Sequence, residues 1–293
     1  MARYGIAIDT EKCMACYNCF MACRDEHCGF ETAVSAPQPH SGQMWVRIDS
    51  KERGDDSRKI KTSNVATMCA HCADAPCRKA AESAAVDSSA SQPPADARSC
   101  AVYTRPDGIV IIDSKKAKGL RQIVDACPIN AIFWNEELEI PQKCTMCAHL
   151  LDEGYEMPRC VEACPNGTLI FGDLDDPDSS INEAIRKGRV TPLQGLAGID
   201  TRVVHLNIPT VFAAGSVYLP DDEPADGAQI VLTHLATGGT KTTATNYFGD
   251  WECEWLDEGT DYSVSVRCDG FEEVTLRFTA DTDKYLGETI LSR

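Results

Sequence analysis

Twelve of the sixteen cysteines in this chain form tight clusters before residue 165. Small disulfide-rich domains spread their cysteines over loops that are to be cross-linked, whereas repeated C-x2-C pairs favour metal binding. Residues 1–9 read as a short strand and lack the apolar stretch of a secretory signal, which also favours metal over disulfides. The cysteine clusters therefore constrain the fold more than any other feature, and their spacing indicates which metal they bind.

The first run of cysteines has the spacing C-x2-C-x2-C-x3-C and consists of Cys13, Cys16, Cys19 and Cys23. In bacterial ferredoxins three closely spaced thiolates hold one [4Fe–4S] cube, and the fourth cysteine of the run ligates another cluster. A tight loop reaches three corners of a cube, while the fourth cysteine has already entered a helix predicted over residues 20–27. Zinc needs only four ligands, usually from two separated C-x2-C pairs, so a structural zinc protein is the less favoured alternative.

A matching run ends the cysteine-rich region and consists of Cys144, Cys147, Cys160 and Cys164. Its third cysteine follows an excursion over residues 148–159, and its C-x3-C-P ending is again that of a ferredoxin. By analogy with paired-cluster ferredoxins, the two runs exchange their fourth cysteines. Cluster 1 then takes Cys13, Cys16, Cys19 and Cys164. Cluster 2 takes Cys23, Cys144, Cys147 and Cys160.

The middle of the chain has four further cysteines and lacks four that the ferredoxin pattern would place there. Those present form a third ligand set, Cys69, Cys72, Cys77 and Cys127. The positions without a cysteine hold Ala81, Ala117, Leu120 and Ile123. Independent losses would more often leave one or two cysteines behind. The pattern therefore predicts three [4Fe–4S] clusters and a fourth site that small and apolar side chains fill.

The order of these motifs resembles the electron-transfer subunits of the molybdopterin oxidoreductase (dimethyl sulfoxide reductase) superfamily. The resemblance includes D-T-E-K-C at residues 9–13, K-C-T-M-C-A-H-L-L at 143–151 and V-E-A-C-P-N-G-T-L-I-F-G-D at 161–173. Within the superfamily, the loss of one cluster and the added C-terminal β domain resemble the small subunits of pyrogallol–phloroglucinol transhydroxylases. Catechol dehydroxylases stay open as the other assignment.

This resemblance implies a non-catalytic electron-transfer subunit in a heterodimer, or a multiple of one. Its large partner would hold a molybdenum or tungsten bis-pterin guanine dinucleotide and act on polyhydroxylated aromatics, by transhydroxylation or by reductive dehydroxylation. The chain itself has no dinucleotide-binding glycine motif, no P-loop and no nucleophile elbow, so we expect no bond-making residue in it. A stand-alone polyferredoxin with a β-sandwich docking module is the alternative function.

The predicted fold class is α+β with two domains. Residues 1–187 are expected to form a pseudo-symmetric pair of bacterial-ferredoxin-like units, with an insertion loop at 82–99. A linker is predicted at 188–202. Short strand candidates separated by Gly and Asp turns predict an all-β sandwich of transthyretin-like or immunoglobulin-like type over 203–293. A charged turn is expected at 51–59.

The charge of the chain limits its partners. Its formal net charge is −17 and it has no basic stripe, so we expect neither nucleic acid nor an anionic membrane as a partner. The sequence contains no run of about 18 apolar residues, so no direct membrane span is predicted. We expect a cytoplasmic protein, or one exported in folded form with a signal-bearing partner.

Several residues beside the clustered cysteines have two interpretations. His71 and His149 could donate a hydrogen bond to a cluster sulfur, or could face solvent or the partner. Lys143 and Arg159 could offset cluster charge, or could be ordinary surface cations. Four cysteines outside the ligand sets are expected to be buried free thiols: Cys28, Cys100, Cys253 and Cys268. A disulfide between the last two is the alternative if the complex is exported.

Overall fold

The computed structural model describes residues 2–56, 58–87 and 100–293, and the chain divides into two compact units. Unit 1 consists of Met1–Ser50 and Asn64–Ile208, and unit 2 of Lys51–Ser63 and Pro209–Arg293. Unit 2 therefore takes a segment from within the region predicted to be ferredoxin-like. Residues 88–99, most of the predicted insertion loop, lie outside the described residues.

The largest sheet of unit 1 is built on the N-terminal strand. In this sheet β1 (Tyr4–Asp9) pairs with antiparallel β8 (Leu169–Asp173) and with parallel β9 (Val203–Leu206). Strand β9 was expected to begin the sandwich, but it pairs with β1 instead, opposite Ile6 to Asp9. Both Val203 and Leu206 are buried there. The strand itself was predicted correctly, but a local pattern cannot specify which sheet it joins.

Three two-stranded pairs complete the strands before residue 169. They are β2 (Val46–Asp56) with β3 (Lys59–Met68), β4 (Val102–Thr104) with β5 (Val110–Ile112), and β6 (Ile132–Asn135) with β7 (Ile140–Lys143). The charged turn expected at 51–59 is wrong, because residues 51–56 continue strand β2. Strands β2 and β3 each have residues in both units.

The helices of unit 1 are mostly short and follow cysteine loops. They are η1 (Thr10–Lys12), α1 (Asn18–His27), α2 (Pro76–Asp87), α3 (Gln122–Asp125), α4 (Ala148–Asp152), α5 (Arg159–Glu162) and α6 (Ser180–Lys187). Helix α2 begins at a proline, a favoured residue for the first helical position, and it includes residues 82–87 of the predicted insertion loop. In the described part of the chain no helix combines the length and the hydropathy needed to cross a bilayer.

The segment 188–202, predicted as a linker, is packed into unit 1. Leu196 is buried in the main hydrophobic core, and the backbone N–H of Ala73 donates to the carbonyl of Asp200 at 2.9 Å. Gly195 has φ +90°, and a Cβ atom there would lie 2.9 Å from the carbonyl oxygen of Pro128. This close approach requires glycine. The segment therefore forms part of the wall around the cysteines.

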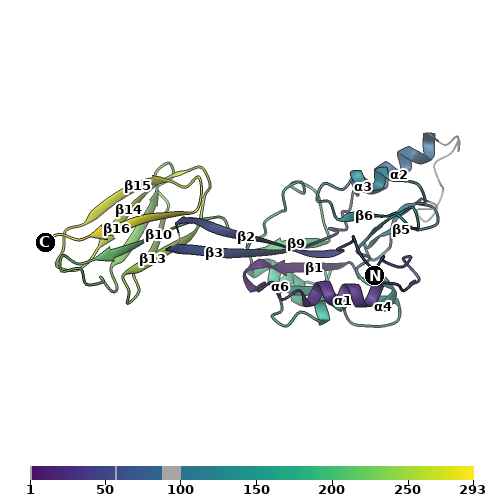
Figure 1. Cartoon of the computed structure of the whole chain (residues 1–293), viewed down its shortest axis with the longest axis horizontal. Helices are drawn as coiled ribbons and strands as arrows, with labels where there is room; N and C mark the ends of the chain where they lie inside the picture. The colour runs from purple at the N-terminus through teal and green to yellow at the C-terminus, as the bar shows by residue number, and fades with distance from the viewer. Residues whose placement is uncertain (1, 57, 88–99) are drawn as a thin grey trace. The chain divides into compact units, whose positions relative to one another are not determined.

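Unit 2 contains two sheets whose side chains share one hydrophobic core. One sheet has the order β13 (Asp250–Leu256), β10 (Val211–Tyr218), β16 (Lys284–Ile290). The other has the order β12 (Thr240–Ala244), β11 (Gln229–His234), β14 (Asp261–Arg267), β15 (Val274–Thr279). These strands lie in the C-terminal part of the chain, drawn in green to yellow in Figure 1. The prediction of a β-rich C-terminal domain is confirmed.

Charged side chains hold the hairpin segment Lys51–Ser63 within unit 2. The guanidinium of Arg53 donates to both carboxylate oxygens of Asp283, at 2.7 and 3.1 Å, and its side chain is only 7% exposed. Lys61 pairs with Glu252 at 3.0 Å and also with Glu254. Breaking a buried ion pair by removing one partner typically costs about 3–5 kcal/mol. The sequence showed these charges but not their partners, which lie about 190 or more positions away.

Candidate metal centres

The first cysteine group surrounds a pocket in unit 1, and Cys16 at its rim is exposed. Its four cysteines, together with apolar neighbours that include Ile48 and Ala66, line a cavity with about 320 Å³ of empty space. Two residues between the cysteines, Ala15 and Tyr17, have left-handed backbone conformations with φ 54° and 61°, which curl the loop. The amide of Asn64 donates to the carbonyl of Cys13 at 3.1 Å and anchors the start of that loop. The members of the group are Cys13, Cys16, Cys19 and Cys164.

The third cysteine group lines a second cavity of similar size, about 350 Å³. Backbone N–H groups point at two of its sulfurs: His71 N lies 3.5 Å from Cys69 Sγ, and Ala131 N lies 3.3 Å from Cys127 Sγ. Hydrogen bonds of this kind stabilise thiolates. Leu196, from the supposed linker, forms part of the wall, so sequence reasoning missed this lining residue. The members of the group are Cys69, Cys72, Cys77 and Cys127.

The second cysteine group is the most deeply buried, since its four cysteines are between 4% and 6% exposed. The thiols of Cys23 and Cys160 both interact electrostatically with Cys144 and Cys147. Met146 N donates to Cys144 Sγ at 3.3 Å. The members of the group are Cys23, Cys144, Cys147 and Cys160. The twelve candidate cysteines therefore lie in three sets of four, and in the first and second sets the fourth cysteine comes from the other run.

Burial raises the pKa of most of these thiols. It raises the pKa of Cys19 to about 11 and that of Cys77 to about 12, and the neighbouring thiols of each group add to the rise. Cys164 differs: burial raises its pKa, but hydrogen bonds from Leu169 and Thr168 outweigh burial and leave the pKa below its ordinary value. Four thiolates in an apolar pocket repel one another, so each group is suited to positive metal centres between the sulfurs.

The donor sets and their spacing fit [4Fe–4S] clusters. Such a cluster is held by four cysteine thiolates, and the first and third groups each supply four thiols around a largely apolar space. Among the described residues, no three His, Cys, Asp or Glu side chains approach closely enough to bind a single metal ion. The first and third groups instead enclose cavities, as described above.

The positions without a cysteine also come together. Ala81, Ala117 and Ile123 are 3%, 0% and 0% exposed, and Leu120 packs against them. They belong to one hydrophobic cluster that also contains Cys77 and borders on Cys72 and Cys127. The prediction that apolar side chains fill this space is confirmed by their packing. We call these four residues the aliphatic plug.

Lys143 is buried beside two cysteine groups. Its residue is 2% exposed, and its ammonium donates to the carbonyl of Cys144 at 3.0 Å and to the carbonyl of Val110. Burial raises the pKa of Cys144 in the second group and of Cys72 in the third, and the positive charge of Lys143 opposes that rise. The interpretation of Lys143 as an ordinary surface cation is therefore wrong. All four residues of β7 are buried, which the short motif itself did not reveal.

The histidines near the cysteines differ in their contacts. His71 is fully buried, and its Nδ1 accepts a hydrogen bond from Val110 N at 3.1 Å, which leaves the proton on Nε2. That Nε2 has no hydrogen-bond partner within the described residues, and His71 lines the cavity of the third group. His149 Nε2 lies 2.9 Å from a carboxylate oxygen of Glu26. His27, which sequence reasoning missed, has its Nε2 3.7 Å from Cys147 Sγ.

The four remaining cysteines are free thiols, and Cys253 and Cys268 are not paired with each other. Cys28 Sγ accepts a hydrogen bond from Arg24 at 3.3 Å and lies 3.4 Å from Nδ1 of His40. None of the four lines either cysteine cavity. They stay outside the candidate ligand sets, as the spacing predicts.

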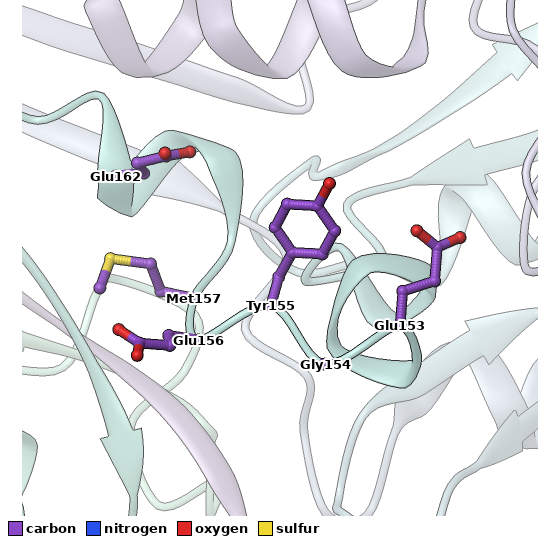
Figure 2. Close-up of a pocket in the computed structure, with 6 residues that line it drawn as sticks. All are labelled: Glu153, Gly154, Tyr155, Glu156, Met157 and Glu162. Carbon is purple, nitrogen blue, oxygen red and sulfur yellow. The ribbon is translucent and has the colours of Figure 1, made fainter.

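An open surface pocket lies on the excursion between Cys147 and Cys160 and is separate from the cysteine groups. Figure 2 shows its lining, with the side chains of Tyr155 and Glu153 on one side and those of Glu156, Met157 and Glu162 on the other. Glu162 is paired with Arg159 outside this lining. The pocket contains none of the twelve candidate cysteines. Its exposed carboxylates are not ligands of the soft metal centres that thiolates select.

Two families match the two parts of the chain. Residues 60–174 match the family described as a 4Fe-4S dicluster domain. Residues 214–290 match the family described as a carboxypeptidase regulatory-like domain. The first match covers the third cysteine group and most of the second, and the second match covers most of the two-sheet unit.

Several proteins of known assignment are similar to the chain. It is 33% identical over 279 residues to the pyrogallol hydroxytransferase small subunit of Pelobacter acidigallici, a match that covers 92% of each chain. It is 31% identical to a putative dimethyl sulfoxide reductase iron-sulfur subunit of Halobacterium salinarum, over 71% of this chain and 80% of that relative. It is 29% identical to a tetrathionate reductase subunit of Salmonella typhimurium, over 72% and 74%. The first match is long enough to include both units.

Proposed function

Since the chain belongs to the iron–sulfur electron-transfer subunits of the molybdopterin oxidoreductases, we propose that its twelve grouped cysteines hold three [4Fe–4S] clusters. Cluster 1 is held by the first group, cluster 2 by the second and cluster 3 by the third, with the residues given for each group above. A bound [4Fe–4S] cluster stores and passes one electron at a time, at a potential that burial, charge and hydrogen bonds to sulfur determine. The chain's own residues provide the thiolates, exclude water and set the local charge.

We propose that unit 1 is a pseudo-symmetric pair of ferredoxin-like halves. In support, each half combines closely spaced cysteines with a distant Cys-Pro ending, at Cys127-Pro128 and at Cys164-Pro165. For unit 2 we propose a transthyretin-like or immunoglobulin-like sandwich. Its two sheets with a common core and the regulatory-like family match support this assignment. The domain would serve in packing or docking within the complex.

The partner we propose is a large catalytic subunit with a molybdenum or tungsten bis-pterin guanine dinucleotide, in a heterodimer or a multiple of it. For the complex we propose polyhydroxylated aromatic substrates, converted by transhydroxylation or by reductive dehydroxylation. The observation that carries this proposal is the similarity to the pyrogallol hydroxytransferase small subunit over 92% of both chains, which extends beyond the cysteine-rich unit. We propose a cytoplasmic location, or export in folded form with a signal-bearing partner.

The complex purified anaerobically from its native host tests this function. One assay supplies a catechol with reduced viologen, and a second supplies pyrogallol with a tetrahydroxybenzene co-substrate. Turnover in the first assay identifies a reductive dehydroxylase, because electrons must then arrive from outside. Turnover in the second identifies a transhydroxylase, because that reaction is redox-neutral overall. Absence of turnover in both assays, from a complex with full metal content, would reject the proposed substrate class.

A stand-alone polyferredoxin is distinguished by its size in solution. If the native chain elutes at its own mass of 31.9 kDa with all its clusters and no large partner, the subunit assignment is wrong. The proposal predicts instead that the chain co-purifies with a molybdenum-containing or tungsten-containing subunit. Affinity purification through a tag on the chain, followed by metal analysis of the whole complex, separates these outcomes.

A further inference from the structure

Lys143 carries a positive charge in the interior of unit 1 with no carboxylate beside it. None of the ion pairs found in the described part of the chain includes this residue, although it is only 2% exposed. Its ammonium donates hydrogen bonds to two peptide carbonyls, those of Val110 and Cys144. A buried ammonium whose charge is not compensated is strongly disfavoured. The protein should therefore place an anion near it.

The two carbonyls that receive these hydrogen bonds belong to different cysteine groups. Cys144 is a member of the second group, and Val110 lines the cavity of the third. The charge of Lys143 acts on thiols of both groups, on Cys144 in one and on Cys77 and Cys127 in the other. The ammonium therefore lies where the second and third groups adjoin.

Other basic side chains near these groups differ from Lys143: His149 Nε2 lies 2.9 Å from a carboxylate oxygen of Glu26, and His27 contacts Cys147 of the second group. Arg159 has a side chain that is 36% exposed and is already paired with Glu26 and Glu162. His71 Nδ1 accepts a hydrogen bond from Val110 N at 3.1 Å, so this nitrogen holds no proton and the ring carries no positive charge. Within the described residues, Lys143 is thus a buried cation that lies beside both groups and is in no ion pair with an acidic side chain.

We propose that Lys143 is the shared counter-charge of clusters 2 and 3 and raises the reduction potentials of both. This inference rests on the proposed function, since the anions in question are the thiolate-bound clusters. One-electron reduction adds a negative charge to a cluster, and a nearby buried cation stabilises that charge. Because one ammonium serves two clusters, it favours electron residence on this pair over cluster 1.

The test compares Lys143→Met with the unaltered complex in a potentiometric titration followed by electron paramagnetic resonance. Methionine has a similar length and no charge, so packing is largely kept. We expect the reduction equilibrium of two clusters to become about tenfold less favourable, which is 59 mV for a one-electron couple, while the third cluster is unchanged. Lys143→Arg, which keeps the charge, should restore both potentials. Lys118→Met, at an exposed lysine whose side chain is 64% accessible, is the matched control.

Iron analysis of the same samples distinguishes a failure of the proposed function from a failure of the role proposed for Lys143. An unaltered complex without three clusters rejects the proposed function itself. The role of Lys143 is overturned if Lys143→Met keeps all its clusters and no reduction potential changes. It is also overturned if the potential of only one cluster changes, or if the potentials of all three change. Loss of two clusters from Lys143→Met but not from Lys143→Arg also supports a counter-charge. Equal loss from both variants overturns it, because shape rather than charge would then matter.

Discussion

The cavity of the third cysteine group and the aliphatic plug are neighbours in unit 1 and are built on the same segments. Cys77 and Ala81 lie four residues apart on α2, and side chains at this spacing on a helix share one face. Ile123 lies on α3 (Gln122–Asp125), and Cys127 follows shortly after the end of that helix. One set of positions presents thiols to an empty space of about 350 Å³, and the other presents methyl and aliphatic groups to one another.

This difference shows that the same local backbone arrangement can either surround a cofactor site or be filled by its own side chains. Ala117 and Ile123 are completely buried against other apolar side chains, so the plug gains stability from hydrophobic packing alone. Burial raises the pKa of Cys72, Cys77 and Cys127 in the third group, and in the proposal iron provides the charge that balances the thiolates. The two regions should therefore respond in opposite ways to loss of iron and to changes in volume.

Complete removal of iron should have the largest effect. We expect chelation under mild denaturant to remove the iron from all three cysteine groups. Hydrogen-exchange protection in β1 and β8 should then fall by about 100-fold or more. The paired strands β11 and β14 of unit 2 should keep their protection, because their core contains no cluster ligand. Exchange measured by mass spectrometry with and without iron tests this. Unchanged protection in β1 would mean that the cysteine groups need no metal.

Removal of a single thiol should have a smaller effect that is confined to one cluster. Cys77→Ala makes its position resemble Ala81, and we expect it to cost about four of about twelve iron atoms per chain. Cys100→Ala removes a half-buried thiol near the same helix and should leave the iron content unchanged. Iron and acid-labile sulfide are measured on both purified variants. Equal iron in the two variants would remove Cys77 from the ligand set.

Truncation inside the plug should cost stability and no iron. Ile123→Ala creates a cavity at a fully buried position, and we expect a loss of about 2–5 kcal/mol in the free energy of unfolding. Leu138→Ala, at a position that is 40% exposed, is the control and should change stability much less. Denaturation of the iron-loaded protein provides the comparison. A loss of iron from Ile123→Ala would show that the plug and cluster 3 are not separate structures.

Added volume in the plug should have the smallest effect of the four changes. Ala117 is 0% exposed, so Ala117→Val has to displace packed neighbours, and we expect it to destabilise the protein by about 1–3 kcal/mol. The same thermal or denaturant measurement is used. A stabilised Ala117→Val protein would contradict the account, because it would reveal unfilled space of the kind found beside the thiols.

Local spacing predicted the parts of the molecule that short motifs encode. The grouping of Cys13, Cys16 and Cys19 with Cys164 was expected from the ferredoxin pattern, and so was the burial of Ala117 and Ile123 in one cluster. These predictions work because three or four residues in a tight loop fix the directions of their side chains. The plug was visible because aliphatic residues stood where a repeated pattern calls for cysteine.

Long-range pairing was not visible in the sequence. Strand β9 reads as a strand next to those of unit 2 in the sequence, yet it joins β1 across nearly 200 residues. Arg53 forms an ion pair with Asp283 at a separation of 230 residues, and the hairpin segment that contains Arg53 belongs to unit 2. For Lys143 the sequence left two interpretations open, an offset of cluster charge or a surface cation, because its burial depends on both sides of β7 being covered. In each case the missing information was which distant segment makes the contact. The periodicity of a short stretch of sequence does not contain that information.

Native mass spectrometry of the subunit, released under anaerobic conditions from the purified complex, tests the central claim most directly. The mass in excess of the polypeptide counts the clusters on this chain alone, without those of a partner. The account predicts three [4Fe–4S] units, about twelve iron and about twelve sulfide per chain. Two units, a fourth unit in place of the plug, or zinc with no sulfide would contradict it.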